Sequence, residues 1–361
     1  ERNKHHGGIG PLINSRGFKK MAAFDAFVKA SPSFTEPELI VSYTQQSGAF
    51  AMLAGGAPEV KIGHYDQYVY QHMLEVRSVA AVNQGSPNVM PNATFRTSYG
   101  SVPTYLLKTR AQYDHHEIAA AANWNVNLAD AKRLAAYQGI FQAARNGLLF
   151  GFTPSNNEGL LNAQGATAVS IPPDAQGHTT LSTMNAPYVF QFLLQTVQDV
   201  RKRILNVGQG EPVKVVITST QDVIGFFEST VVDLMSFQRV GAGVDSIKGA
   251  TSSVNEWNGV DIEWRVDDNL KGQGAGGTDA ILVIVPELAP QGKSPVSTNV
   301  FADKLQPSSK ATARQYFGSD TPLEYTAQLP GGFLDITYEH RMTPGWMLRP
   351  KALSIVSVKY A

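Results

Sequence analysis

The amino-acid sequence predicts an α+β fold, in which strands and helices occupy separate stretches of the chain. Residues 59–112 carry apolar and polar side chains in alternation, which is typical of strands. Residues 127–150 carry apolar side chains at intervals of three and four, which is typical of one long helix. Residues 185–304 mix helical and strand patterns, and strand patterns return in residues 305–361.

The composition excludes several classes of function. The 361 residues include 30 Lys and Arg and 30 Asp and Glu, so the net charge is zero, whereas a dedicated nucleic-acid binder would carry a basic excess. Charged residues make up only 17% of the chain, against roughly a quarter in an average soluble protein, which suggests that other protein covers much of the surface. The lack of cysteine excludes disulfides and thiolate metal sites. No apolar run approaches the roughly 20 residues that a membrane-spanning helix needs.

Residues 1–58 are predicted to form an N-terminal arm. A short amphipathic helix is expected over residues 20–29, and the arm cannot bury its scattered aromatic side chains by itself. We therefore expect the arm to lie against another surface, with an ordinary extension packed on its own domain as the alternative. The chain begins at Glu1 without a methionine, and we expect a processed or trimmed product.

Residues 59–112 are predicted to form an extended loop, a two-stranded ribbon that projects from the body. Tyr68, Tyr70 and His72 alternate with other side chains on one strand, and a turn-rich stretch over residues 83–91 separates this strand from the next. A lone ribbon is only marginally stable in water, so this one needs a partner surface.

Residues 113–184 are predicted to begin with two helices. An alanine-rich helix is expected over residues 115–123, and the long helix follows over residues 127–150. The apolar stripe of the long helix consists of Leu134, Tyr137, Phe141, Ala144 and Leu148.

Residues 185–304 are predicted to form an α/β domain. A helix over residues 186–206 leads to a strand over residues 213–218. Ser219 and Asp222 then form a pair similar to a capping box, which opens a second helix. The apolar face of the first helix consists of Val189, Leu193, Val197, Val200 and Ile204, and that of the second of Val223, Phe227, Val231 and Leu234.

The rest of this domain is predicted to be a loop and two strands. Residues 241–253 are polar and rich in glycine, which favours a loop. Asn258-Gly259 is typical of a hairpin turn and precedes a strand that starts at Val260. Residues 280–285 are continuously apolar, which indicates a buried strand. Strands are also expected in residues 305–361, the last of them over residues 353–360.

Phosphate-binding motifs are present only in part. Gly292-Lys293-Ser294 ends like a phosphate-binding loop, but Glu287 stands where that motif needs its first glycine. Gly272, Gly274 and Gly277 match a dinucleotide-binding fingerprint by spacing. They precede a predicted strand, whereas the fingerprint follows a strand and opens a helix, so a hairpin loop is the better interpretation.

Catalytic and metal-binding patterns give no site. No Gly-x-Ser-x-Gly turn occurs, so the common serine-hydrolase motif is missing. His115 and His116 are adjacent on a predicted helix, about 100° apart, and cannot easily share one metal ion. Asp267-Asp268 is better explained as a turn than as a catalytic carboxylate pair. We predict no catalytic, cofactor-binding or metal-ligating residue, and no cofactor.

Two blocks of sequence resemble major capsid proteins of tailed bacteriophages with the Hong Kong 97-type fold. The first block consists of Tyr113-Asp-His-His-Glu117, Asn127-Leu-Ala-Asp130, Asn146-Gly-Leu-Leu-Phe-Gly151 and Glu158-Gly-Leu-Leu-Asn162. The second runs from Leu329-Pro-Gly-Gly-Phe to Pro350-Lys-Ala-Leu. The order of the predicted units along nearly the whole chain is similar to that of the family.

The resemblance implies an organisation into five parts. These are an N-terminal arm (1–58), an extended loop (59–112), a peripheral domain with a spine helix (113–184, helix 127–150), an axial domain (185–304) and peripheral return strands (305–361). It implies a structural protein, not an enzyme, that self-assembles as pentamers and hexamers into an icosahedral shell around phage double-stranded DNA.

The resemblance also implies partners and a location. The main partner would be the chain itself, with scaffolding, portal and decoration proteins as further candidates. Contact with packaged DNA would be non-specific and weak, because the net charge is zero. We expect no membrane contact, assembly in the host cytoplasm and a final place in the virion.

Two alternatives stay open at this point. An encapsulin-type bacterial nanocompartment would share the fold but enclose protein cargo instead of DNA. A soluble α/β enzyme with an unrecognised site in residues 185–304 belongs to a different class of function. A ligand-dependent shift in the melting temperature of a monomer would favour the enzyme.

Overall fold

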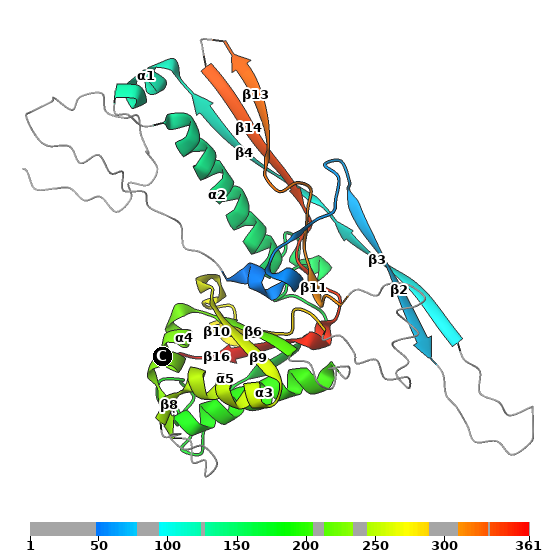
Figure 1. Cartoon of the computed structure of the whole chain (residues 1–361), viewed down its shortest axis with the longest axis vertical. Helices are drawn as coiled ribbons and strands as arrows, with labels where there is room; N and C mark the ends of the chain where they lie inside the picture. The colour runs from blue at the N-terminus through cyan, green and yellow to red at the C-terminus, as the bar shows by residue number, and fades with distance from the viewer. Residues whose placement is uncertain are drawn as a thin grey trace, which may run out of the picture.

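The computed structural model describes residues 48–77, 94–123, 127–204, 213–233, 244–288, 310–330 and 333–360. The expectations for the arm up to residue 47, including its helix, lie outside these residues. The described chain is elongated (Figure 1). A long helix and a long sheet run along one half, a compact unit of sheet and helices lies at one end, and a two-stranded ribbon projects to the side.

The long sheet is built around β14 (Phe333–Met342). Strand β14 pairs antiparallel with β13 (Leu323–Leu329) on one side and with β4 (Tyr105–Tyr113) on the other. Short strands extend this sheet beyond the end of β14. They are β12 (Tyr316–Phe317) and β1 (Glu59–Val60), while β11 (Ala313–Arg314) pairs with β15 (Trp346–Met347) nearby.

Helix α2 (Leu128–Leu149) confirms the long helix predicted over residues 127–150, and it packs on one face of the long sheet. The Asn127 side chain caps the helix by accepting a hydrogen bond from the backbone N–H of Asp130. The buried stripe differs from the prediction, because Leu134 is 45% exposed while Ala136 and Ile140 are buried. The shorter helix α1 (His115–Asn123) has the predicted bounds. The core between α2 and the sheet contains Ala111, Tyr113, Ala136, Ile140, Ala144, Phe317, Tyr338 and Met342.

The compact unit, called the α/β unit below, is a five-stranded sheet with helices on one face. The strand order is β5 (Thr167–Ser170), β16 (Leu353–Val358), β10 (Asp279–Ile284), β6 (Val213–Ser219) and β9 (Val260–Val266). Every residue of β10 is buried, as predicted for a central strand. Strands β5 and β16 come from outside residues 185–304, so two distant segments complete this sheet.

Three helices cover one face of the α/β unit. They are α3 (Ala186–Arg203), α4 (Gln221–Ser229) and α5 (Ile247–Trp257). All five apolar residues predicted for α3 are buried. The opposite face of the sheet packs on the short 3₁₀ helix Ala49–Met52 and on the end of α2, through Met52, Leu148 and Leu149.

Three predictions for this unit are wrong in their details. Helix α4 is capped by Thr220 rather than Ser219, and it ends before Val231, which lies exposed in β7 (Val231–Asp233). Helix α5 occupies part of the predicted loop 241–253 because Ser246 caps its first turn. Asn258-Gly259 therefore connects α5 to β9 and is not a hairpin turn; β7 pairs instead with β8 (Val244–Ser246).

Candidate assembly surfaces

The ribbon consists of β2 (Tyr68–Arg77) and β3 (Thr94–Pro103), paired antiparallel over ten residues. The register places Tyr68, Tyr70, His72 and Tyr99 on one face, because His72 lies opposite Tyr99 and side chains alternate along a strand. We call these four residues the ribbon face. The three tyrosines are 54%, 68% and 71% exposed in order of sequence.

The ribbon face is arranged as a row of rings. The ring centroids of Tyr68 and Tyr70 lie 6.3 Å apart, and those of His72 and Tyr99 lie 4.9 Å apart. Large exposed rings of this kind are enriched at the centres of protein interfaces. Together with the marginal stability of a lone ribbon, they favour contact with a second protein surface.

The base of the ribbon is anchored to the body of the same chain. The guanidinium of Arg341 on β14 donates hydrogen bonds to the backbone oxygen of Asp66, at 2.7 Å, and to the hydroxyl of Thr104, at 2.8 Å. The backbone N–H of Thr104 donates to the oxygen of Gln67 at 2.9 Å. These bonds fix the direction in which the ribbon leaves the long sheet.

The face of the long sheet that points away from α2 is a second surface, which we call the open sheet face. Ion pairs cross it between β4 and β14, from Arg110 to Asp335 at 2.7 Å and from Lys108 to Glu339 at 2.5 Å. The hydrogen bond from Lys108 lowers the pKa of Glu339, which also pairs with His64 at 3.3 Å.

The open sheet face also carries apolar side chains along β13. Leu323 and Tyr325 are 37% and 48% exposed, and Tyr325 lies 6.4 Å from the His64 ring. Within the described residues β13 pairs only with β14, so its outer edge is unpaired there. An exposed edge with apolar side chains is a surface that proteins usually cover.

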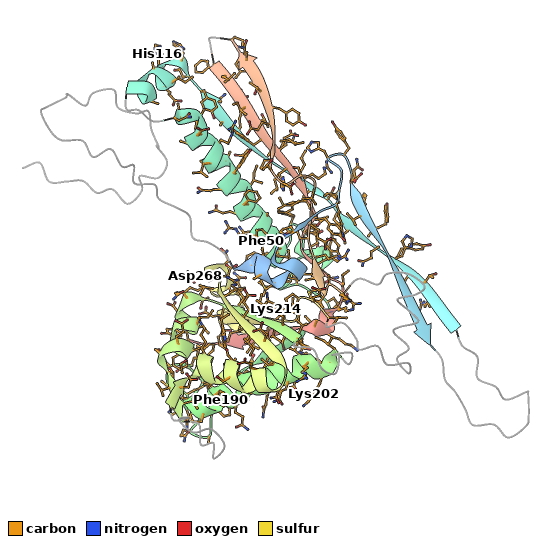
Figure 2. The ribbon with its side chains drawn as sticks, viewed as in Figure 1. Phe50, His116, Phe190, Lys202, Lys214 and Asp268 are labelled. Carbon is orange, nitrogen blue, oxygen red and sulfur yellow. The ribbon has the colours of Figure 1, made fainter. Side chains whose placement is uncertain are left out.

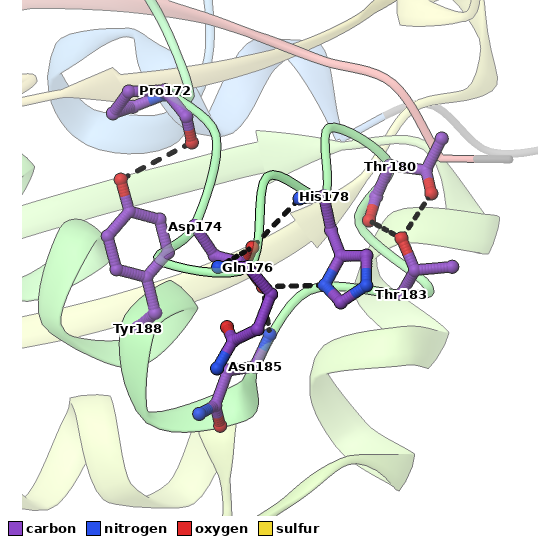
Figure 3. Close-up of polar contacts among 8 residues, drawn as sticks. All are labelled: Pro172, Asp174, Gln176, His178, Thr180, Thr183, Asn185 and Tyr188. Carbon is purple, nitrogen blue, oxygen red and sulfur yellow. Dashed lines mark hydrogen bonds and ion pairs between the residues drawn. The ribbon is translucent and has the colours of Figure 1, made fainter.

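A loop before α3 is held rigid by the carboxylate of Asp174 (Figure 3). This carboxylate accepts hydrogen bonds from the backbone N–H groups of Gln176, His178 and Asn185 and pairs with the His178 ring at 2.9 Å. Burial alone would raise the pKa of Asp174, but these hydrogen bonds outweigh it and lower the pKa to about 2. The loop therefore presents a fixed shape at the edge of the α/β unit.

The structure places the histidines and glycines that the sequence analysis considered for metal and nucleotide binding. None of their His, Asp and Glu side chains form a group that could hold a metal ion. The His115 and His116 rings lie 3.9 Å apart at the start of α1 and contact each other. The glycines at 272, 274 and 277 precede β10, as predicted, and do not open an α-helix. No helix in the described part of the chain is long and apolar enough to cross a membrane.

The sequence pointed to the ribbon as a contact element but not to its whole face. The alternation of Tyr68, Tyr70 and His72 was visible in the sequence. The place of Tyr99 beside them depends on the register of β2 and β3, which the turn-rich stretch between them did not fix. The open sheet face was missed because β4 comes from a part of the chain distant from β13 and β14.

A family model described as major capsid protein matches residues 79–285, more than half of the chain. No protein of curated function matches the sequence. Three solved structures that are similar over most of their length are described as "The capsid of Myoviridae Phage XM1", "Mycobacterium phage Adephagia" and "Capsid of native GTA particle".

The three structures are similar to this chain in fold but have little sequence identity with it. The XM1 capsid chain is 14% identical, with a TM-score of 0.63, and the match covers 91% of this chain and 97% of that one. The Adephagia chain is 10% identical, with a TM-score of 0.56 and coverages of 91% and 95%. The native GTA chain is 10% identical, with a TM-score of 0.53 and coverages of 98% and 100%. The predicted Hong Kong 97-type fold is thereby confirmed.

Proposed function

The chain belongs to the major capsid protein family, and from this membership we propose that it assembles as pentamers and hexamers into an icosahedral shell around phage double-stranded DNA. The observation that carries the proposal is the ribbon face. It places three exposed tyrosines and a histidine on a projecting element that the described part of its own chain leaves uncovered. In a shell, such an element would bury its rings on a neighbouring subunit.

The proposal assigns the open sheet face to contacts of the same kind. A shell subunit makes several interfaces, and stable ones bury about 1,600 Å² each. The exposed Leu323 and Tyr325 on β13 offer apolar surface next to the ion pairs between β4 and β14. Apolar area beside polar groups is the composition of a typical interface. Many such contacts in a closed shell add up without any one of them being strong.

The proposal also covers further binding partners and the location of assembly. Scaffolding, portal and decoration proteins would contact the shell, and the packaged DNA would contact it without sequence preference. Assembly would take place in the host cytoplasm. The chain would have a structural role and no catalytic one. The contents of purified particles distinguish this function from a protein-filled compartment, because only a virion shell would contain DNA.

A paired substitution on the ribbon face tests the proposal. We expect Tyr70→Ser with Tyr99→Ser to abolish shells, seen by negative-stain electron microscopy, because each change removes a large apolar ring from the contact. Circular dichroism and the melting temperature of the unassembled subunit should stay unchanged, since both rings are exposed. The matched control, Tyr70→Phe with Tyr99→Phe, keeps the rings and should assemble. Normal shells from the serine variant would refute the role of the ribbon.

A further inference from the structure

A pocket of about 610 Å³ opens at one end of the α/β unit, where α3 and α5 end and β9 begins. Two valines line its floor, and its polar lining consists of Gln198, Arg201, Lys202, Asn255 and Asn258. Among the described residues no carboxylate lines this pocket. Asn255 and Asn258 each donate one side-chain hydrogen bond to a backbone oxygen of α5. The two cations, with the Gln198 amide beside them, are suited to binding a carboxylate or another oxygen-rich anion.

The lining of the pocket stays positive after the charges of the helix ends are included. The ends of α3 and α5 each contribute about half a negative charge, which together offset about one of the two cations. Asp199 pairs only loosely with Lys202, at 3.6 Å between Oδ1 and Nζ. The Arg201 guanidinium is held in place, since its Nη1 donates a hydrogen bond of 2.8 Å to the backbone oxygen of Asn258. A fixed guanidinium loses little entropy when it binds an anion.

The opposite end of the same unit is rich in aspartate. Asp222, at the start of α4, and Asp268, just after β9, are exposed there, and we call these two residues the acidic corner. Asp279, at the start of β10, lies beside them, and Lys271 pairs with Asp222 at 2.9 Å. The hydrogen bond to Asp222, followed by the charges of Asp222, Asp279 and Asp268, raises the pKa of Lys271. Asp268 also accepts a hydrogen bond of 2.8 Å from the backbone N–H of Gln221. The three carboxylates outnumber the one lysine even after the positive end of the α4 dipole, about half a charge, is included.

The pocket and the acidic corner lie at opposite ends of two parallel strands. Strands β6 and β9 both begin at the pocket end, where Val213 lies opposite Val260, and both end at the acidic corner. Seven residues of strand separate the two ends by about 20 Å. Figure 2 shows Lys202 and Asp268 on opposite sides of the unit. The two surfaces are therefore too far apart to meet within one subunit.

We propose that the pocket receives the acidic corner of the next copy of the chain within a pentamer or hexamer. Subunits in a closed ring meet head to tail, so that one flank of each subunit contacts the opposite flank of its neighbour. Oppositely charged flanks satisfy this arrangement, and they discourage the reversed contact between two flanks of the same charge. This inference rests on the proposed shell function and names the contact that orients neighbours in the ring.

Charge reversal tests the contact in assembled shells. We expect a pocket variant, Arg201→Glu with Lys202→Glu, and a corner variant, Asp222→Lys with Asp268→Lys, each to lower the yield of shells at least tenfold. The variant that combines all four changes faces a negative pocket with a positive corner, so it restores opposite charges and should recover most of the yield. The control Lys351→Glu reverses an exposed charge outside both surfaces and should assemble normally. Full assembly of the pocket variant would overturn the proposal.

A second measurement needs no shells and therefore separates this inference from the proposed function. The pocket variant keeps an intact corner, and the corner variant keeps an intact pocket. A mixture of the two should form a dimer in analytical ultracentrifugation at low salt, while each variant alone stays monomeric. A mixture that stays monomeric at every concentration would overturn the proposal. So would loss of binding to short duplex DNA in the pocket variant with assembly unchanged, since the pocket would then serve nucleic acid.

Discussion

His340 is a fully buried histidine in the core between α2 and the long sheet. Its ring lies against the rings of Phe317 and Phe141, with centroids 4.6 and 6.1 Å away, and neither ring nitrogen has a hydrogen-bond partner among the described residues. Burial, followed by the charge of His64, lowers the pKa of His340 to about 4. The core therefore holds this side chain in its neutral form at neutral pH.

The neutral state of His340 predicts a pH dependence of stability. An unfolded histidine binds its proton near pH 6.5, while the folded His340 resists protonation until about pH 4. Stability should therefore fall as the pH drops from 6.5 to 4, by about 3 kcal/mol from this group, and level off below. We expect His340→Leu to lose less stability over this range in urea titrations. The control His72→Leu removes an exposed histidine that has no ion pair among the described residues, and it should follow the wild type.

At the scale of elements, the joint at the end of α2 connects the two halves of the molecule. The backbone N–H groups of Leu160 and Leu161 donate to the last free carbonyls of the helix, at Leu148 and Leu149. Gly159 makes this approach possible, because a Cβ there would collide with the carbonyl carbon of Phe150. The joint thus explains physically why the blocks 146–151 and 158–162 contain glycine beside paired leucines.

Substitution of Gly159 should lower the free energy of unfolding by more than backbone strain alone would. Gly159 has a φ of 86°, which costs a residue with a side chain about 1–2 kcal/mol. Gly177 has a φ of 83°, but a methyl group added there would have no atom within 4 Å, so Gly177→Ala measures the strain by itself. We expect Gly159→Ala to lower the free energy of unfolding clearly further, because the methyl group collides with backbone. Equal losses in the two variants would contradict the role of the joint.

Elements with a strong periodic pattern could be predicted from the sequence, and elements defined by caps or distant pairing could not. The stripe of α3 and the apolar run of β10 are long and regular, and both are buried as predicted. Helix α5 contains Gly249, Thr251 and two serines, so its weak helix propensity suggested a loop. What stabilises it is local, namely the Ser246 cap and the packing of Ile247 and Ala250.

The candidate surfaces also differ in whether a local sequence pattern predicts them. The ribbon could be predicted because its strands are neighbours in sequence with alternating side chains. The pocket at the end of α3 could not, because Arg201 and Asn258 lie 57 positions apart and meet through the packing of α3 against α5. The open sheet face depends on β4 and β14, whose paired residues Arg110 and Thr337 are more than 200 positions apart. Contacts of this range carry no local signal in a single sequence.

For the molecule as a whole, the zero net charge and the projecting elements have the same explanation, which is assembly with other copies of the chain. With 30 acidic and 30 basic side chains, no net repulsion keeps copies apart. The same charges are separated locally, into a positive pocket and an acidic corner. The projecting ribbon and the unpaired edge of β13 add surfaces that a single described chain does not cover (Figure 1). A subunit of this kind is expected to complete its structure only among its own copies.

Copies of this chain are proposed to form a closed shell around DNA. The most direct test is light scattering and negative-stain electron microscopy of the native material, with nuclease-protected nucleic acid measured in the same fraction. We expect uniform polyhedral particles, tens of nanometres across, that contain double-stranded DNA. Monomers or small open oligomers at every salt and protein concentration, even after scaffolding and portal partners are supplied, would contradict it.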